Sequence, residues 1–418
     1  MKRTINAYFF EAHERKHIMK ILFPSWKNFG LEDITETFRE MGHTVLHYTQ
    51  EPKNYRLDPR FKSELKKFIR TNGIDFVFTS NYFPVISNAC HELDIPYLSW
   101  CYDNPLVLAY SKTILHPCNH IFLFDSQMTQ DIQNLGVTNA HYLPMAANAK
   151  RLNSLKATSH QKKIIEADVS FVGSLYTEKH TLYDRMEQLD NGTRTYLEAI
   201  MEKQRKIYGK SIVEEALSPD VIQKLLEAMP VELHKDGMET YTYIYANYFL
   251  YRKITQTERT ELLSLISHAL PKMPCYASKP APPLKLYTPE KTPFLPNVKN
   301  MGPVHYLQEM PLVFRYSKIN LNITLRSIKN GIPLRAIDIM GAGGFLLTNY
   351  QNDFNRHFTD GTDYVSFSST EDMLGKIEYY LSHEKEREEI AKNGWEKVCA
   401  EHTYKQRIQE MLTISQVI

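Results

Sequence analysis

The chain has few cysteines, no long apolar run and no excess of charge of one sign. Its five cysteines among 418 residues form no Cys-x-x-Cys pair, which argues against a disulfide framework or a zinc site and favours reduced thiols in a cytoplasmic protein. Fifty Lys and Arg residues balance 48 Asp and Glu residues, so no net field favours nucleic acid or an anionic membrane. No segment approaches the roughly 20 apolar residues that a transmembrane helix needs.

Charged residues interrupt the first 18 positions, and therefore no signal peptide or other targeting segment is expected there. Met19 begins the apolar segment Met-Lys-Ile-Leu-Phe, which has the pattern of a buried strand. We therefore expect residues 1–18 to be an extension ahead of the folded chain, either disordered or tag-like.

Short apolar strands alternate with amphipathic helices, a pattern typical of parallel sheets covered by helices. The segment from residue 20 to 143 forms one Rossmann-like half, polar residues 149–163 suggest a linker, and Ala167–Val172 begins a second sheet. Residues 178–270, rich in Glu, Lys, Leu and Met, are expected to be a mostly helical insertion between the first two strands of that sheet. Further strands are expected at Leu284–Tyr287, Val304, Ile319–Ile323, Phe345–Thr348 and Tyr364–Phe367.

The most informative segment runs from Asn330 to Thr348 and has the pattern of a loop, a helix, a glycine stop and a buried strand. Pro333 suits the first helical position, and the free amides beside it, at the positive end of the helix dipole, suit phosphate oxygens. Arg335 adds a forked cation, and Asp338, one turn later on the same face, could accept both hydroxyls of a ribose. A diphosphate and ribose site fits this segment, and so does an ordinary helix with a solvated Arg–Asp pair.

Other loops at the carboxyl ends of predicted strands add candidate contacts, because open parallel sheets bind ligands at that edge. Gly173 allows close backbone approach, Lys179 in the same loop could reach a phosphate, and backbone groups at Gly302 could pair with a nucleobase edge. Each glycine taken singly also fits a simple turn, and Arg326 also fits a solvated helix face. The predicted donor-site residues are Gly173, Lys179, Gly302, Asn322, Thr324, Arg326, Asn330, Gly331, Arg335 and Asp338.

The segment from Tyr316–Thr324 through this motif to His402–Tyr404 resembles the glycosyltransferase module of spore-maturation CgeB-like proteins. Residues 73–180 look like the uncharacterised domain that often precedes this module in Firmicutes. The residues that carry this second likeness are Ser99–Pro105, Phe124–Asp125 and Asp168–Gly173.

The resemblance implies a GT-B fold, an α/β architecture of two Rossmann-like domains facing a cleft, here with the helical insertion in the second. An acceptor domain would cover residues 19–160, and a donor domain residues 161–403. A last helix at about 404–418 would cross back to the first domain. Related retaining transferases carry a Glu-x₇-Glu pair whose spacing falls here on Asn330 and Asp338. The residue at the ribose position, Asp338, is thus a shorter acid than glutamate, and the residue at the sugar position, Asn330, is uncharged.

The resulting expectation is a glycosyltransferase that moves a hexose-type sugar from a nucleotide sugar, most simply a UDP-sugar, to a glycan, glycolipid or protein acceptor. The chain lacks an Asp-x-Asp triplet, which agrees with a metal-independent enzyme without a cofactor. Two alternatives stay open. One is a sugar-nucleotide 2-epimerase of the same fold, which needs acids and histidines around the sugar. The other is a catalytically silent GT-B protein that binds a partner through the insertion.

If the reaction inverts configuration, a carboxylate or histidine of the first domain should deprotonate the acceptor. Asp103 follows the strand Pro96–Trp100 at its carboxyl end and is the candidate base, although it could equally cap the turn before Asn104–Pro105. Weaker candidates are His180, His305 and His402. The tyrosines at 241, 243, 245, 248 and 251 are expected to pack within the insertion rather than to stack on sugars or bases.

Overall fold

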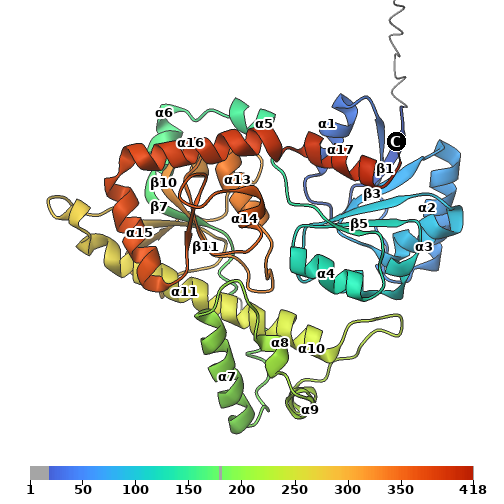
Figure 1. The fold of residues 1–418 in the computed structure, drawn as a ribbon, viewed down its shortest axis with the longest axis horizontal. Coiled ribbons are helices and arrows are strands. Elements are labelled where there is room, and N and C mark those ends of the chain that lie inside the picture. Colours follow the sequence, from blue (N-terminus) through green and yellow to red (C-terminus); the bar gives the residue numbers. More distant parts are fainter. Residues whose placement is uncertain (1–17, 178–180, 418) are drawn as a thin grey trace, which may run out of the picture.

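The structure is a computed structural model that describes residues 18–177 and 181–417. These residues form two α/β domains side by side, each built on a six-stranded parallel sheet (Figure 1). The predicted α/β architecture of two Rossmann-like domains is confirmed. Residues 1–17 of the predicted extension lie outside the described residues, as do Lys179 and His180.

The first domain has a sheet whose central strands are completely buried, as expected where helices cover both faces of parallel strands. Its strands are β1 (Lys20–Pro24), β2 (Thr44–Tyr48), β3 (Phe76–Ser80), β4 (Tyr97–Cys101), β5 (Asn119–Leu123) and β6 (Ala140–Tyr142), in the spatial order β2-β1-β3-β4-β5-β6. Its helices are α1 (Leu31–Glu40), α2 (Pro59–Asn72), α3 (Pro84–Leu93) and α4 (Ser126–Asn134), with the 3₁₀ turns η1 (Val107–Tyr110) and η2 (Lys112–Leu115).

The second domain repeats this plan. Its strands are β7 (Ala167–Val172), β8 (Leu284–Tyr287), β9 (Val298–Asn300), β10 (Ser317–Asn322), β11 (Leu346–Asn349) and β12 (Val365–Phe367), in the order β12-β11-β10-β7-β8-β9. Its helices are α12 (Met310–Tyr316), α13 (Leu334–Gly341), α14 (Phe354–His357), α15 (Thr370–Ser382) and α16 (Glu384–Glu401), with the 3₁₀ turns η4 (Leu270–Lys272) and η5 (Pro274–Tyr276).

Two local predictions are wrong. Val304 is not in a strand: the edge strand is β9, and the chain turns at Gly302 (φ 79°) before Pro303, which has no amide hydrogen to pair. The expected linker at 149–163 is largely helical, with α5 (Ala149–Ser154) and α6 (Ser159–Ile165). Polar residues there cap helices: the side chain of Thr158 accepts from the amide of Gln161, which returns the bond in a capping box.

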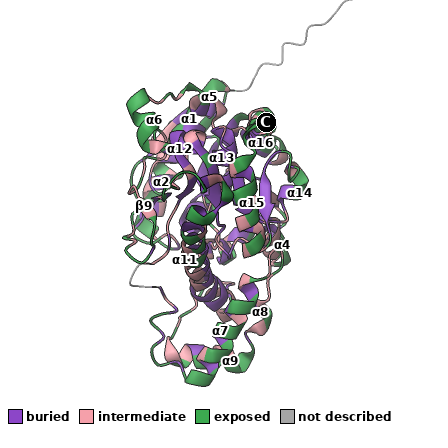
Figure 2. Ribbon diagram, turned by 90° about the vertical axis from the view of Figure 1, so that its left-hand side faces the viewer, coloured by how far each residue is buried: buried purple, intermediate pink, exposed green. Residues whose placement is uncertain are grey.

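The helical insertion lies between β7 and β8 and has two parts. Its long helix α11 packs against the second sheet, while the preceding helices project away and bury a core of their own (Figure 2). The insertion contains α7 (Asn191–Arg205), α8 (Val213–Ala216), α9 (Pro219–Ala228), α10 (Tyr241–Ile244), the π-helical turn η3 (Tyr245–Leu250) and α11 (Tyr251–Ala269).

The C-terminal helix α17 (Tyr404–Ile414) packs against α1 of the first domain, so the end of the chain ties the domains together (Figure 1). At this crossing the amide of Ala147 donates to the carbonyl of His402 at 3.0 Å, and the guanidinium of Arg407 donates to the carbonyl of Pro144 at 3.1 Å. The domains also meet at Gly331, where a Cβ would lie 2.9 Å from both Cα and Cβ of Asp125. Only glycine fits this contact without a backbone shift.

The free energy of unfolding is expected to depend on pH through His402, which lies at the domain crossing. This buried ring accepts a hydrogen bond from Arg407, and burial together with the nearby charge of Arg407 lowers its pKa to about 3. Since an unfolded histidine titrates near 6.5, stability should fall as the pH drops from about 6.5 towards 3, by roughly 1.4 kcal/mol per pH unit from this group. Urea unfolding at pH 7.5 and 5.5 measures the slope. The variant His402→Gln should reduce it, and an unchanged slope would contradict this assignment.

Candidate functional site

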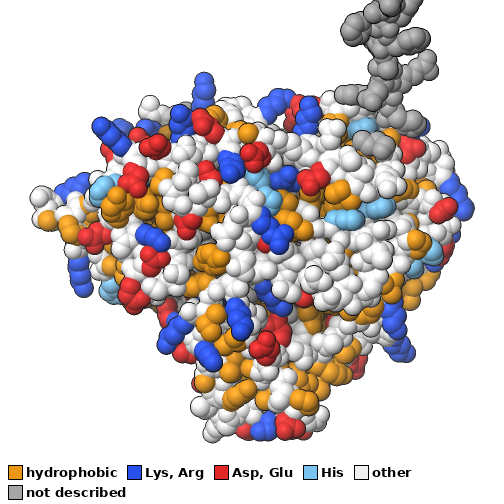
Figure 3. All heavy atoms as spheres, in the orientation of Figure 1, with side chains coloured by type: hydrophobic (Ala, Val, Ile, Leu, Met, Phe, Trp, Pro, Cys, Tyr) orange, Lys and Arg blue, Asp and Glu red, His pale blue; other side chains and the backbone are white. Residues whose placement is uncertain are grey.

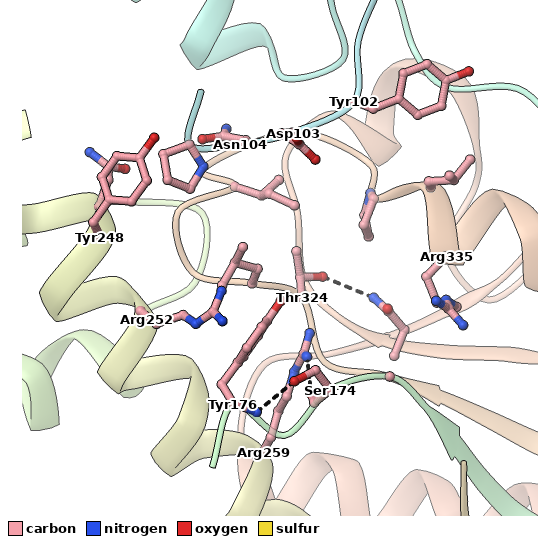
Figure 4. Close-up of a pocket in the computed structure, with 18 of the residues that line it drawn as sticks. Tyr102, Asp103, Asn104, Ser174, Tyr176, Tyr248, Arg252, Arg259, Thr324 and Arg335 are labelled. Atoms are coloured by element: carbon pink, nitrogen blue, oxygen red, sulfur yellow. Dashed lines mark hydrogen bonds between the residues drawn. The ribbon is translucent and has the colours of Figure 1, made fainter. Parts of the chain in front are cut away.

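A cavity of about 610 Å³ lies between the two domains, at the carboxyl ends of their strands (Figure 4). The first domain contributes the loop after β4, and the second contributes the loops after β7 and β10 and the first turn of α13. The insertion contributes η3, at Asn247 and Tyr248, and helix α11. The polar and charged lining residues include Asp103, Asn104, Ser174, Tyr176, Asn247, Tyr248, Arg252, Arg259, Asn322, Thr324 and Arg335.

The loop that follows β7 forms part of the cavity wall at Gly173, Ser174 and Tyr176. The carboxylate of Glu290 holds this loop in place: it accepts from the amides of Leu175 at 2.8 Å and Tyr176 at 3.2 Å and from the hydroxyl of Ser174. Hydrogen bonds from backbone donors to a carboxylate are stronger than neutral ones, so this wall is preset before any ligand binds.

Arg259 is the most buried cation of the cavity, with 8% of its surface exposed. Its guanidinium donates to the carbonyl of Ile323 at 3.0 and 2.5 Å and to the carbonyl of Ser174 at 2.5 Å. No carboxylate forms an ion pair with it within the described part of the chain, and burial lowers its pKa. An anion in the cavity would therefore compensate a charge that carbonyl dipoles and aromatic rings now solvate.

Two further arginines approach the cavity from different helices. Arg252 lies 3.6 Å from the ring centre of Tyr176, and Arg259 lies on the same ring at 4.9 Å. Arg335 comes from the first turn of α13, where its guanidinium lies 5.7 Å from the ring of Phe314 and donates to the sulfur of Met310. The helix begins at Leu334, so Pro333 is the N-cap rather than the first helical residue, a correction of one position.

Charge on the cavity wall is unbalanced. Of the described lining residues, three are arginines and one, Asp103, is an acid. The outer surface is different, because on the face drawn in Figure 3 Lys and Arg side chains are interspersed with Asp and Glu side chains. Arginines thus outnumber acids among the described lining side chains, which suits an anionic group such as a diphosphate.

Asp103 lies across the cavity from Arg259 (Figure 4). Asn81 orients it: the Asn81 amide donates to the Asp103 carboxylate at 2.8 Å, and its oxygen accepts from the amides of Tyr102 and Asp103 at 2.8 and 3.0 Å. Asn81 has φ 73°, a left-handed conformation that asparagine tolerates better than most residues. Partial desolvation raises the pKa of the Asp103 carboxyl, and the Asn81 hydrogen bond opposes this.

The structure brings Gly173, Asn322, Thr324, Arg335 and Asp103 together around the cavity, as the sequence predicts for that edge of the sheets. Asn322 is already engaged, because its amide donates to the hydroxyls of Thr324 and Thr348 at 3.0 and 2.9 Å. It supports the floor of the cavity through these bonds.

Arg326 and Asn330 correct the sequence-based placement, because neither lines the cavity. Arg326 is buried in an ion pair with Glu258, at 2.7 and 2.6 Å, and joins β10 to the insertion. Asn330 lies at the domain contact, where its amide side chain donates to Ser126 and accepts from Asn352. Gly331 likewise serves the close contact between the domains.

Asp338 and Gly302 also lie off the cavity lining. Asp338 is 5% exposed and accepts a 3.0 Å hydrogen bond from the hydroxyl of Tyr306, so a ribose could reach it only after Tyr306 moves. The amide of Gly302 donates to the side chain of Asn300 at 2.9 Å. His305 is exposed outside the cavity, and His402 is buried at the domain crossing.

Removing the charge of Asp338 is expected to stabilise the protein at pH 8. Burial raises the pKa of this carboxyl to about 7, against 3.8 in the unfolded chain, so its contribution to stability is lost as the pH rises from about 4 to 7. At pH 8 the variant Asp338→Asn should therefore unfold at a higher urea concentration than the wild type. Its free energy of unfolding should be larger by roughly 2–4 kcal/mol. The difference should shrink at pH 5. Equal or lower stability of the variant at pH 8 would contradict the buried charge.

Sequence reasoning missed Arg252, Arg259 and Tyr248, which the insertion places on the cavity, and Asn81, which orients Asp103. The two arginines are seven residues apart and share one face of α11, a spacing visible in the sequence. Their position at the cavity could not be predicted, because nothing in the sequence indicates that the insertion lies next to the cleft. Tyr248 also shows that the tyrosines of the insertion do more than pack its core.

The arrangement of two such domains about a cleft defines the GT-B fold. The chain is similar to a glycosyltransferase from Rickettsia africae at 10% identity and a TM-score of 0.52, covering 96% of this chain and 98% of that one. It is similar to Anabaena HepE in complex with UDP-glucose at 11% identity and a TM-score of 0.51, covering 96% and 100%. It is also similar to a UDP-forming α,α-trehalose-phosphate synthase from Burkholderia xenovorans at 12% identity and a TM-score of 0.51, covering 96% and 99%.

Residues 264–413 match the protein family described as glycosyl transferase-like. This segment contains Arg335, Thr324 and most of the second sheet, so the match falls on the C-terminal domain. No curated protein matches the chain in sequence. Across the described residues no helix is long and apolar enough to cross a membrane, and no group of three or more His, Cys, Asp and Glu side chains could hold a metal ion.

Proposed function

We propose that the protein is a metal-independent, CgeB-like glycosyltransferase that acts in the cytoplasm. It would transfer a hexose-type sugar from a UDP-sugar to a glycan, glycolipid or protein acceptor. The observation that carries this proposal is the cavity between the domains, where three arginines lie on the wall and one carboxylate lies opposite. HepE, a protein of the same fold, binds UDP-glucose, which supports the choice of donor.

The proposed chemistry follows from these charges. Arg335, Arg259 and the loop at Ser174 would bind the diphosphate and stabilise the negative charge that develops on it as the glycosidic bond breaks. Asp103 would accept the proton of the acceptor hydroxyl if the reaction inverts configuration, and its raised pKa makes it a better base than an ordinary aspartate. Asp338 would accept hydrogen bonds from the ribose hydroxyls once Tyr306 moves aside. Backbone groups near Gly302 would pair with the edge of the nucleobase.

Incubation of the purified protein with a panel of nucleotide sugars tests this proposal. We expect slow release of UDP and free sugar from one UDP-sugar without acceptor, undiminished by EDTA. Conversion to an altered nucleotide sugar would instead show a 2-epimerase. Thermal stabilisation by a nucleotide sugar without any turnover would show a catalytically silent binding protein.

A further inference from the structure

The loop from Tyr102 to Val107 carries Asp103 into the cavity, and fixed contacts hold its first half. Asn81 holds the backbone at Tyr102 and Asp103, as described above. The next residue, Asn104, donates through its side chain to Asp125 at 3.0 Å. Its carbonyl accepts a 2.8 Å hydrogen bond from the hydroxyl of Ser327 in the second domain. The conformation of the loop therefore depends on groups from both domains.

The insertion contacts the other end of this loop, at Val107. The amide of Val107 donates at 2.9 Å to the phenol oxygen of Tyr248, which lies 141 residues later in η3. The carbonyl of Val107 accepts at 3.1 Å from the guanidinium of Arg56. Both backbone groups of Val107 are thus bound by side chains, and one of those side chains belongs to the insertion.

Arg56 is itself held by the insertion. It donates to Glu239 at 3.0 Å and to Asp236 at 3.1 Å. Arg56 and Glu239 are 8% and 7% exposed, so this ion pair is buried. Removing one partner of such a pair leaves an uncompensated charge, and the pair therefore resists separation.

The segment around Gly237 adds a short backbone ladder to the first domain. The amide of Lys112 donates to the carbonyl of Asp236 at 2.8 Å, and the amide of Met238 donates to the carbonyl of Tyr110 at 2.6 Å. The ring of Tyr110 lies 4.1 Å from the ring of Tyr243 in α10. The insertion thus reaches from the second domain beneath the first (Figure 1).

We propose that the insertion is a clamp that fixes the conformation of loop 102–107, with Tyr248 as a positioning residue for Asp103. The catalytic part of this inference rests on the proposed function, whereas the conformational part does not. Tyr248 lines the cavity, as do Asn104 and Pro105 of the loop, so its loss would act at the loop itself.

The test compares Tyr248→Phe with Tyr241→Phe, a matched control in the same insertion that does not line the cavity. Hydrogen exchange should become at least tenfold faster for the amides of loop 102–107 in Tyr248→Phe and stay unchanged in the control. The kcat for transfer should fall about tenfold, while the Kd for UDP stays within twofold. A merely structural residue would instead change Kd, kcat and the midpoint of unfolding together.

Each outcome decides a separate point. Unchanged exchange in the loop, or loss of UDP affinity in parallel with kcat, overturns the clamp. Faster loop exchange in a protein whose wild type turns over no nucleotide sugar supports the clamp and rejects the proposed function. If Tyr248→Phe does not fold, Glu239→Gln, which weakens the hold on Arg56, takes its place with the same readouts. Unchanged loop exchange in that variant also overturns the proposal.

Discussion

Replacing Arg335 by alanine is expected to lower kcat/KM for the sugar donor by about two to three orders of magnitude. The guanidinium lines the cavity from the first turn of α13 and forms no ion pair among the residues that the structure describes. It is therefore available to a diphosphate, and a donor aimed at developing charge is typically worth about 10²–10³ in rate. Initial rates of UDP release and the Kd for UDP measure the effect.

Two variants control for this result. Arg335→Lys keeps the charge but loses the planar fork, so it should recover only part of the activity. Arg60→Ala removes an exposed arginine far from the cavity, whose partner is Glu64 on the same helix, and should behave as wild type. An Arg335→Ala enzyme within twofold of wild type in both Kd and kcat/KM would exclude Arg335 from the donor site.

Asp103→Asn is expected to reduce kcat by about 10²–10⁴ while leaving the Kd for UDP unchanged. The side chain keeps its shape, and it lies across the cavity from the arginines (Figure 4). Only the ability to accept a proton is lost. In the wild type, kcat/KM should fall on the acid side with a pKa above the ordinary value for aspartate, because desolvation favours the neutral carboxyl.

Asp94→Asn is the matched control, because Asp94 is an exposed residue at the C-cap of α3, away from the cavity, and its left-handed φ of 54° suits asparagine. It should leave kcat and its pH profile as in wild type. An Asp103→Asn enzyme with near wild-type kcat would show that this carboxylate is not the catalytic base. That result is expected for a retaining mechanism in which groups of the donor accept the proton of the acceptor hydroxyl.

The fold could be predicted from the sequence because its signals are local. Strands buried on both faces, such as β3 and β4, are mostly apolar along their length, and the helices between them carry one apolar stripe each. The alternation of the two patterns defines parallel sheets, and parallel sheets define the edge where ligands bind. For that reason the sequence alone predicts Asp103, Gly173 and Thr324 at the edge where the cavity lies.

Side-chain partners far apart in sequence could not be predicted in this way. Arg326 has the charge and the position in the sequence expected of a phosphate ligand. Its side chain is paired instead with the carboxylate of Glu258, which lies 68 residues earlier, on the insertion. Asn330 has the spacing of a sugar contact, but it lies against Ser126 of the other domain, 204 residues away. Spacing along one helix fixes its faces, and only the docking of the domains decides which face meets the ligand.

The insertion shows the same limit more strongly. Its helical composition is evident in the sequence, but its contact with the first domain depends on partners far apart in the chain, such as the buried pair Arg56 and Glu239, separated by 183 residues. Nothing in either local sequence marks them as partners. The cavity consequently gains Tyr248, Arg252 and Arg259 from a segment whose pattern alone indicates only a helical bundle.

The most direct test of the central claim is a crystal structure of the protein with UDP. We predict that the diphosphate lies between the two domains, within hydrogen-bonding distance of the guanidinium of Arg335 and beside the loop at Ser174. UDP bound outside this cavity, or an empty cavity in crystals soaked with UDP at saturating concentration, would contradict the account.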